Sequence, residues 1–237
     1  MSTAQRAPKA EAEERKSFTE KLAEFLRKNR TALLAVLVVV LVVLAGVAVY
    51  SMAVSSRAKA STARVEALAD DMNAWASEQD EAKKAEAEKA LLSGLDETIA
   101  KWPRSFAAGK ALSMRARLSE GKKDWAAAEK DWNEIVLRLP KTYLAPIALQ
   151  NAAVAAEERG APEAAAAYYR KLVEGYDAKT VGIPHALFSL GRLAEDSKDF
   201  AAAVASYEKI VASYPDDDWT KLAKDRIIFL KSRGLSK

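Results

Sequence analysis

Side chains that commonly carry out chemistry are scarce in this chain of 237 residues. It has no cysteine and a single histidine, His185. These counts exclude a thiol nucleophile, a disulfide framework, a thiolate metal site and a pair of histidine ligands within one chain. A metal at His185 would need carboxylate ligands alone. We therefore interpret His185 as a residue of a groove or of a helix start.

An acidic run is the other candidate for chemistry. Asp216, Asp217 and Asp218 are consecutive, but they lack the spaced glycine and the distal glutamate of a calcium loop. Three acidic residues before a helix instead complement the positive end of its dipole. No glycine-rich phosphate loop is present. We predict no catalytic, cofactor or metal site, and an unrecognised site of Glu, Asp and Lys is the enzyme alternative.

The distribution of charge limits the classes of partner. The net charge is +4, and residues 1–30 hold eight basic and five acidic residues. A nucleic-acid-binding protein needs a basic stripe to displace the counterions of the phosphates. The rest of the chain shows no such stripe. We expect neither a nucleic acid nor a small-molecule substrate as partner.

One long segment is apolar. Residues 31–56 contain no charged residue, and the 19 residues Ala32–Tyr50 are almost wholly apolar. As a helix those residues reach roughly 28 Å, close to the hydrocarbon thickness of a bilayer. A buried core helix is the alternative, but it would not need Val and Leu on every face. The pattern predicts a transmembrane helix over residues 31–56, in contact with lipid.

The flanks of this segment predict its orientation. Three basic residues, Arg27, Lys28 and Arg30, crowd its amino-terminal side, which favours a cytoplasmic amino terminus. A cleaved signal peptide is the competing interpretation. Its apolar region usually spans about 7–15 residues and follows a short basic lead. The longer lead and core favour an uncleaved signal anchor.

The tail before the anchor, residues 1–30, is predicted to be cytoplasmic and to have two parts. Residues 1–16 are polar and are expected to be disordered. The sequence from Ser17 to Glu20 is a capping-box pattern that begins a short amphipathic helix at the membrane surface. A transmembrane helix that begins early is the alternative. The residues that share the apolar face are Phe18, Leu22, Phe25 and Leu26.

Three segments align without gaps: residues 124–140, 161–177 and 199–215. They start 37 and then 38 residues apart. In each, a small residue precedes an aromatic residue by four positions, which places both on one helix face. The small residue lets a neighbouring helix approach, and the aromatic ring fills the space above it. The pairs are Ala128 with Trp132, Ala165 with Tyr169, and Ala203 with Tyr207.

The helices before these segments repeat as well, so each unit is a helix pair. We expect a linker helix and a degenerate first pair in residues 57–103, and the clearer repeats with a closing helix in residues 104–237. Only 9 Gly and 7 Pro are present, which argues against an all-β fold with its frequent turns. The predicted fold is all-α: a single transmembrane helix, an α-solenoid of about three to four helix pairs, and a C-terminal capping helix.

The third unit resembles the tetratricopeptide repeat (TPR). The first unit matches that pattern in part and the second weakly, and the observed spacing exceeds the family's length of about 34 residues. Longer loops or helix ends are therefore implied. The matching residues of the third unit are Leu187, Leu190, Gly191, Ala194, Ala203, Tyr207 and Pro215.

The resemblance implies a role in helix packing for ten residues. They are Leu112, Ala128, Trp132, Leu149, Ala165, Tyr169, Leu187, Gly191, Ala203 and Tyr207.

In that family the first helix of each pair lines a concave groove that holds a segment of a partner. Ordinary solvated helix residues are the alternative interpretation of each groove position. Members that clamp a C-terminal carboxylate use Lys and Asn at set positions, and only Asn151 has a comparable place. The implied groove residues are Lys110, Ser113, Arg117, Gln150, Asn151, Val154, His185, Phe188 and Arg192.

The layout of tail, single span and repeats is similar to that of YfgM-like inner-membrane proteins. This implies a bacterial inner-membrane protein with a periplasmic repeat domain, associated with the translocon, periplasmic chaperones or an envelope complex. The expected function is non-enzymatic binding of other proteins, as an accessory factor for protein translocation, folding or envelope assembly. The alternative is a structural scaffold subunit of a large envelope machine, such as a secretion or motility apparatus.

Overall fold

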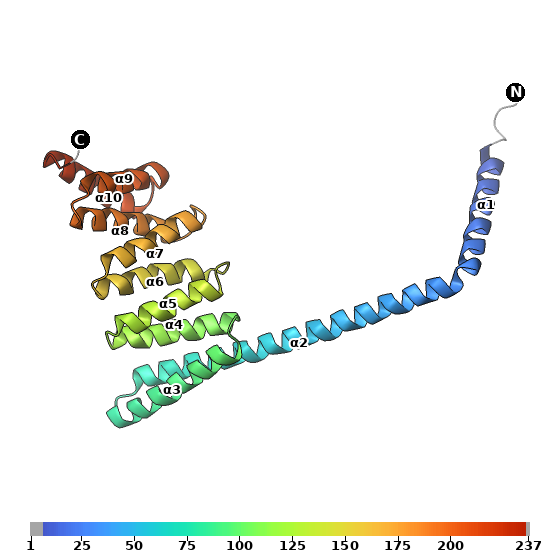
Figure 1. Ribbon diagram of the computed structural model, residues 1–237, viewed down its shortest axis with the longest axis horizontal. Coiled ribbons are helices and arrows are strands. Elements are labelled where there is room, and N and C mark those ends of the chain that lie inside the picture. The colour runs from blue at the N-terminus through green and yellow to red at the C-terminus, as the bar shows by residue number, and fades with distance from the viewer. Residues whose placement is uncertain (1–6, 236–237) are drawn as a thin grey trace. The chain divides into compact units, whose positions relative to one another are not determined.

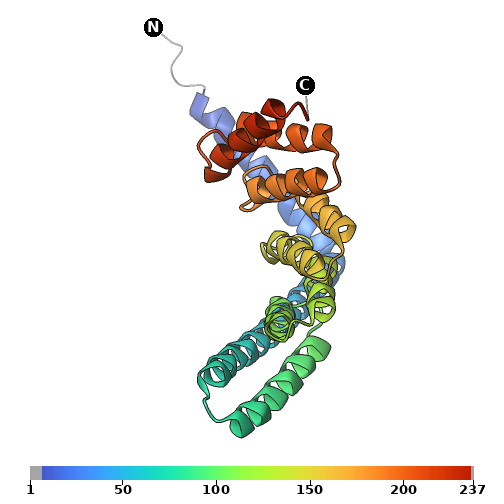
Figure 2. The ribbon, with the colours of Figure 1, turned by 90° about the vertical axis from the view of Figure 1, so that its left-hand side faces the viewer.

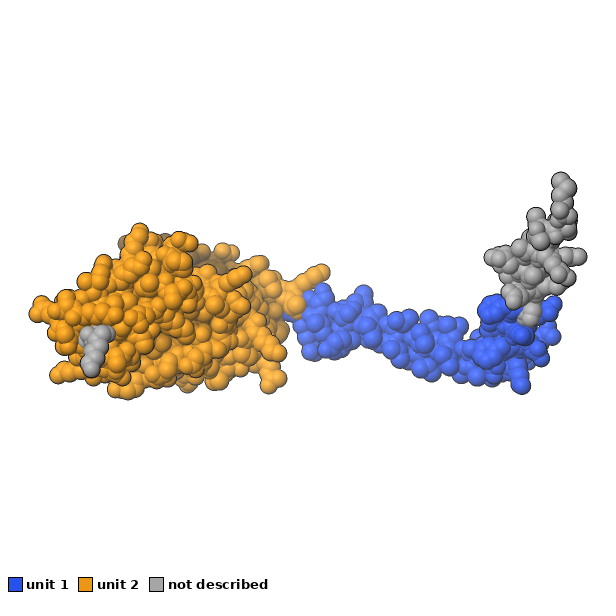
Figure 3. Space-filling model, turned by 90° about the horizontal axis from the view of Figure 1, so that it is seen from above, with its two compact units in different colours: residues 1–57 blue, residues 58–237 orange. Residues whose placement is uncertain are grey.

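The computed structural model describes residues 7–235, with side chains from Phe18 onward. The chain forms two compact units, residues 1–57 and residues 58–237, coloured separately in Figure 3. Every regular element among the described residues is an α-helix. The prediction of an all-α fold with a solenoid is therefore confirmed.

The first unit begins with α1 (Ala7–Lys28). Residues 7–16, which the sequence predicted to be disordered, belong to this helix, and its start lies ahead of the predicted cap at Ser17. Ala, Glu and Lys dominate these residues and are strong helix formers, which accounts for the difference. Residues 1–6 lie outside the described residues. The chain turns at Asn29, whose side-chain Nδ2 donates to the Phe25 carbonyl at 2.9 Å.

The helix α2 (Arg30–Ser77) is 48 residues long and contains the apolar segment. Its most apolar window has a mean hydropathy of 3.3, and none of that window is buried by protein. This helix is long and apolar enough to cross a membrane, and the core helix of a soluble protein or a signal sequence can have the same length and composition. The predicted span and the predicted linker helix thus lie on one continuous helix.

The second unit is a stack of helices that follow one another in chain order (Figures 1 and 2). Residues 58–77 of α2 lie against α3, where Leu68 packs on the backbone of Gly94. The pairs α4–α5, α6–α7 and α8–α9 follow, and α10 packs on α9 and α8. The bounds are α3 (Glu81–Lys101), α4 (Phe106–Gly121), α5 (Trp125–Arg138), α6 (Leu144–Glu158), α7 (Pro162–Gly175), α8 (Ile183–Asp196), α9 (Phe200–Ser213) and α10 (Asp218–Ser232).

The turn inside each pair has the same backbone form. Lys123, Gly160 and Lys198 occupy equivalent places and have φ angles of 60°, 77° and 62°. In two of the pairs an aspartate caps the next helix: Asp124 accepts from the Ala127 amide at 3.1 Å, and Asp199 makes the equivalent bond. The middle pair has no such cap, and its second helix begins with Pro162. Proline has no backbone N–H, so the first turn of that helix has one fewer amide that needs a partner.

The core of the second unit is rich in alanine, which lets the helices approach closely. The ten residues that the sequence assigned to packing are all buried. Tyr169 and Tyr207 are among the largest fully buried side chains. The acidic run before α10 includes its cap, because Asp217 accepts from the Trp219 amide at 2.9 Å.

Candidate protein-binding surface

The nine predicted groove residues lie on the first helices of the three pairs. Three are on α4, three on α6 and three on α8. Because the helix pairs repeat, equivalent positions of successive first helices lie side by side, so Ser113, Gln150 and Phe188 form one row and Arg117, Val154 and Arg192 another. The first-helix strip is our name for the surface made of these nine residues, Ile147 of α6, and Trp219 and Leu222 of α10.

The structure brings four of the nine together. Val154, His185, Phe188 and Arg192 line one cleft of about 280 Å³. The residues on α4, together with Gln150 and Asn151, lie outside this cleft. Sequence reasoning missed the other lining residues, which are Glu157, Glu158, Tyr169, Ser189 and Trp219.

Aromatic rings form the wall of the cleft. The His185 ring lies 4.8 Å from Trp219 and 6.1 Å from Tyr169, measured between centroids. Phe188 lies 5.1 Å from Trp219 and 5.2 Å from Tyr207. Rings at these distances attract one another, so the wall is a preformed apolar surface.

A hydrogen-bonded network underlies this wall. The Tyr169 hydroxyl donates to Glu157 Oε1 at 2.9 Å, and Arg192 of the next helix pair donates to the same carboxylate. Arg192 also lies 3.6 Å from Asp196. The positive charge of Arg192 is therefore balanced by carboxylates of the protein itself.

The same network recurs along the stack. Tyr207 donates to Glu195 at 2.6 Å, and Arg226 Nε donates to Glu195 at 3.0 Å. In the pair α4–α5, Trp132 Nε1 donates to Glu120 at 2.6 Å. The three carboxylates, Glu120, Glu157 and Glu195, share the spacing of 37 and 38 residues that the aromatic residues have. That spacing was a signal in the sequence, and alignment of the acidic positions would have found it.

The protonation states in the cleft follow from burial and from this network. Burial lowers the pKa of His185, a shift that Glu157 opposes and Arg192 assists. The imidazole is therefore neutral at pH 7. Burial raises the pKa of Tyr169 to about 12, which keeps its hydroxyl a donor to Glu157. His185 Nδ1 is buried without a hydrogen-bond partner among the described residues.

The α4 end of the strip has a different character. Lys110 and Arg117 are exposed, and neither has an ion pair within the part of the chain that the structure describes. Lys110 Nζ lies 5.7 Å from the Phe106 ring, and the Phe106 and Tyr143 rings are 5.4 Å apart. Residues 98–119 contain five basic and no acidic residues. This end is basic, whereas the cleft is aromatic.

Two family models of the tetratricopeptide repeat match this stack of helix pairs, one over residues 113–180 and the other over residues 185–217. This chain contains tetratricopeptide repeats. The matched residues run from within α4 to the end of α9 and include the cleft residues of α6 and α8. Solenoids of such repeats commonly use an extended concave surface for binding.

A relative from Treponema pallidum (strain Nichols), described as a TPR repeat-containing protein, is 31% identical over 148 residues. The alignment covers 62% of this TPR chain and 61% of the relative. The chain thus spans less than two thirds of the length of that relative.

Proposed function

We propose that this TPR protein is membrane-anchored and binds a segment of other proteins at the bacterial envelope along its first-helix strip. It acts there without catalysis, as an accessory factor for protein translocation, folding or envelope assembly. The observation that carries the proposal is the cleft, where Val154 of α6, Phe188 of α8 and Trp219 of α10 present one apolar wall.

Exposed apolar side chains continue this wall along the strip. Ile147 and Val154 on α6 are 48% and 40% exposed, and Leu222 on α10 is 47% exposed. Exposed apolar side chains that form a contiguous patch are typical of a surface that binds another protein. The strip therefore suits a partner segment with apolar residues at successive turns.

Charge gives the segment a direction. Lys110 and Arg117 at the α4 end make no ion pair among the described residues, whereas Arg192 and Arg226 are paired with Glu157 and Glu195. An acidic residue of the partner is accordingly expected over α4, and apolar residues over α8 and α10. Complementary charge of this kind sets register and speeds association.

The membrane anchor rests on the apolar part of α2. Its side chains are exposed to solvent over residues 33–54, and a soluble protein rarely exposes so large an apolar surface. The basic residues before it favour a cytoplasmic amino terminus. The repeats then lie in the periplasm, anchored to the inner membrane.

Site-specific photo-crosslinking in intact cells tests the proposed binding. A photoreactive amino acid at Phe188 or Arg117 is expected to attach discrete partners. The same group at Lys130, exposed on the second helix α5, is the control. Crosslinks from Lys130 equal to those from the strip would contradict the proposal. Attachment to one assembly at fixed stoichiometry would instead support the structural-scaffold alternative.

Topology needs a separate test. A phosphatase that is active only in the periplasm, fused after Lys237, is expected to be active. Activity of a cytoplasm-only reporter at the same place would overturn the orientation and leave the binding strip unaffected.

A further inference from the structure

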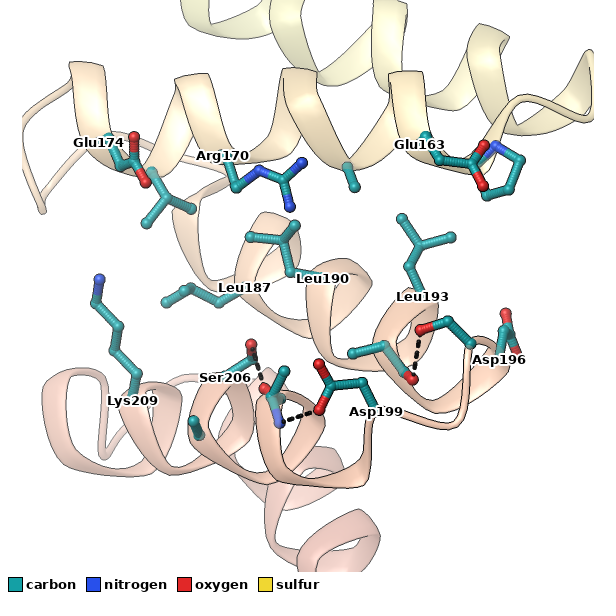
Figure 4. A pocket seen from close by; sticks show the side chains of 17 residues that line it. Glu163, Arg170, Glu174, Leu187, Leu190, Leu193, Asp196, Asp199, Ser206 and Lys209 are labelled. Carbon is teal, nitrogen blue, oxygen red and sulfur yellow. Dashed lines mark hydrogen bonds between the residues drawn. The ribbon is translucent and has the colours of Figure 1, made fainter.

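A second and larger depression lies on the opposite helices of the repeats. It has a volume of about 740 Å³ and runs between α7 and α9, the second helices of two successive pairs, with α8 beneath (Figure 4). We call it the α7–α9 trough. It shares no lining residue with the cleft of the first-helix strip.

The inner surface of the trough is apolar. Leu187, Leu190 and Leu193 of α8 follow one another along its floor (Figure 4). Small residues form much of the walls, with Ala166 on α7 and Ala202 and Ala205 on α9. Small wall residues leave room for a backbone to lie close to the leucines. The lined face of α7, from Glu163 to Glu174, is about 17 Å long, or about three helical turns.

The charges at the two ends of the trough differ in sign. Glu163, Asp196 and Asp199 gather at one end, whereas Arg170 and Lys209 lie toward the other, near Glu174 (Figure 4). Among the described residues, neither Arg170 nor Lys209 forms an ion pair. The trough therefore has an acidic end and an end with two uncommitted cations.

The apolar floor limits the conformation of an occupant. An extended segment would place unpaired amide and carbonyl groups over leucine side chains, which costs free energy for each group. A helix satisfies its own backbone groups and presents an apolar stripe to the floor. An occupant of about three turns is therefore a helix.

The charges then set the direction of that helix. Natural helices favour acidic residues in the first turn and basic residues in the last, because of the helix dipole. Such a helix fits when its first turn meets Arg170 and Lys209 and its last turn meets the acidic end. It then runs antiparallel to α7 and α9, which both begin at the acidic end.

We propose that the α7–α9 trough is a second docking site, which binds one amphipathic helix of a partner protein. The partner helix has an acidic first turn, a stripe of aliphatic residues and a basic last turn. The proposal is independent of what occupies the first-helix strip. A chain with both sites can hold two partner segments at once.

A pair of synthetic peptides tests it. The probe is a fluorescent peptide of about 16 residues, with leucines at helical spacing, glutamates in the first turn and lysines in the last. Its partner peptide has the two charged ends exchanged. Each is titrated by anisotropy onto the full chain in lipid nanodiscs, with empty nanodiscs as the blank. The first peptide is expected to bind about tenfold more tightly than the exchanged one.

Variants separate docking in the trough from other binding. Ala205 is an exposed wall residue, so Ala205→Trp fills the trough without disturbing the core, and a loss of affinity of about tenfold or more is expected. Ala126→Trp, at an exposed alanine of α5, is the matched control and should change nothing. The double variant Arg170→Glu with Lys209→Glu should abolish the preference between the peptides. Since each ratio compares the same two peptides, their own helicity cancels.

Three outcomes would overturn the proposal. They are an absence of saturable binding, equal affinity of the two peptides for the unmodified chain, and equal loss in the two tryptophan variants. Crosslinking from Phe188 and Arg117 is unaffected by any of them, so failure of this site and failure of the first-helix strip are distinguishable.

Discussion

The Tyr207 ring lies directly against the backbone of Gly191. A Cβ atom built on Gly191 would stand 2.4 Å from Tyr207 Cε1, well inside van der Waals contact. Tyr207 is fully buried, and its hydroxyl is fixed by Glu195, so the ring has no room to move. The glycine is therefore required by the ring on the facing helix rather than by its own backbone angles.

Gly191→Ala is accordingly expected to destabilise the fold. Overpacking of this kind costs about 1–3 kcal/mol of unfolding free energy. Gly175→Ala is the matched control, since a Cβ there meets nothing within 4 Å and alanine favours a helix by up to about 1 kcal/mol. Chemical denaturation followed by circular dichroism measures both. Equal stability of the two variants would show that the ring adjusts at no cost.

The Glu195 network predicts a dependence of stability on pH. Burial alone would raise the pKa of Glu195, but hydrogen bonds from Arg226 and Tyr207 outweigh it and hold that pKa below its ordinary value. The ionised carboxylate thus stabilises the fold at pH values above the pKa of the unfolded chain. That contribution is lost as the pH falls through the lowered pKa of the folded state.

Glu195→Gln should therefore melt at a lower temperature than the unmodified chain at pH 7, and the difference should shrink as the pH falls below about 4. Glu174→Gln, at an exposed site, controls for the loss of one negative charge. Thermal melts between neutral and acidic pH provide the measurement. A difference that stays constant with pH would exclude this role of ionised Glu195.

Backbone strain in the turns gives a stabilising prediction. Lys198 has a φ of 62°, in the left-handed region that costs a side-chain-bearing residue about 1 kcal/mol. Lys198→Gly should raise the unfolding free energy by a few tenths to about 1 kcal/mol. The reverse change at the equivalent turn, Gly160→Ala at φ 77°, should lower it. Denaturant titration of both variants checks the opposite signs.

The packing within the helix pairs was predictable because it depends on the spacing of residues along a single helix. A small residue four positions before an aromatic one places both on one helix face, whatever surrounds them, and these residues are buried as expected. The cleft was predictable only in part. Trp219 follows His185 by 34 residues, a different interval from the other repeats, so alignment did not place it on the strip.

Two further features depend on tertiary packing. A glutamate within a helix, such as Glu157, is normally predicted to be exposed to solvent. Only its equivalent position in successive repeats indicates a shared role. The α7–α9 trough depends on the distance between the second helices of two successive pairs. That distance is set by contacts between the helix pairs. No pattern within either helix encodes that separation.

The final prediction distinguishes the three basic residues that the sequence placed on the strip. Lys110 and Arg117 are exposed and make no ion pair within the described residues, so reversing them to Glu should leave the melting temperature nearly unchanged. Arg192 is held by Glu157 and Asp196. Arg192→Glu places three carboxylates together beside the cleft, and the melting temperature should fall by about 2–4 °C or more.

The two exposed residues, Lys110 and Arg117, should affect binding rather than stability. Lys110→Glu with Arg117→Glu is expected to weaken crosslinking from Phe188 without unfolding, because free charges steer a partner and fix its register. Lys130→Glu with Lys171→Glu, at exposed residues of second helices away from the strip and the trough, controls for net charge. If that control weakened crosslinking equally, nonspecific charge would account for the binding. If Arg192→Glu melted like the unmodified chain, the carboxylates around Arg192 would not depend on its charge.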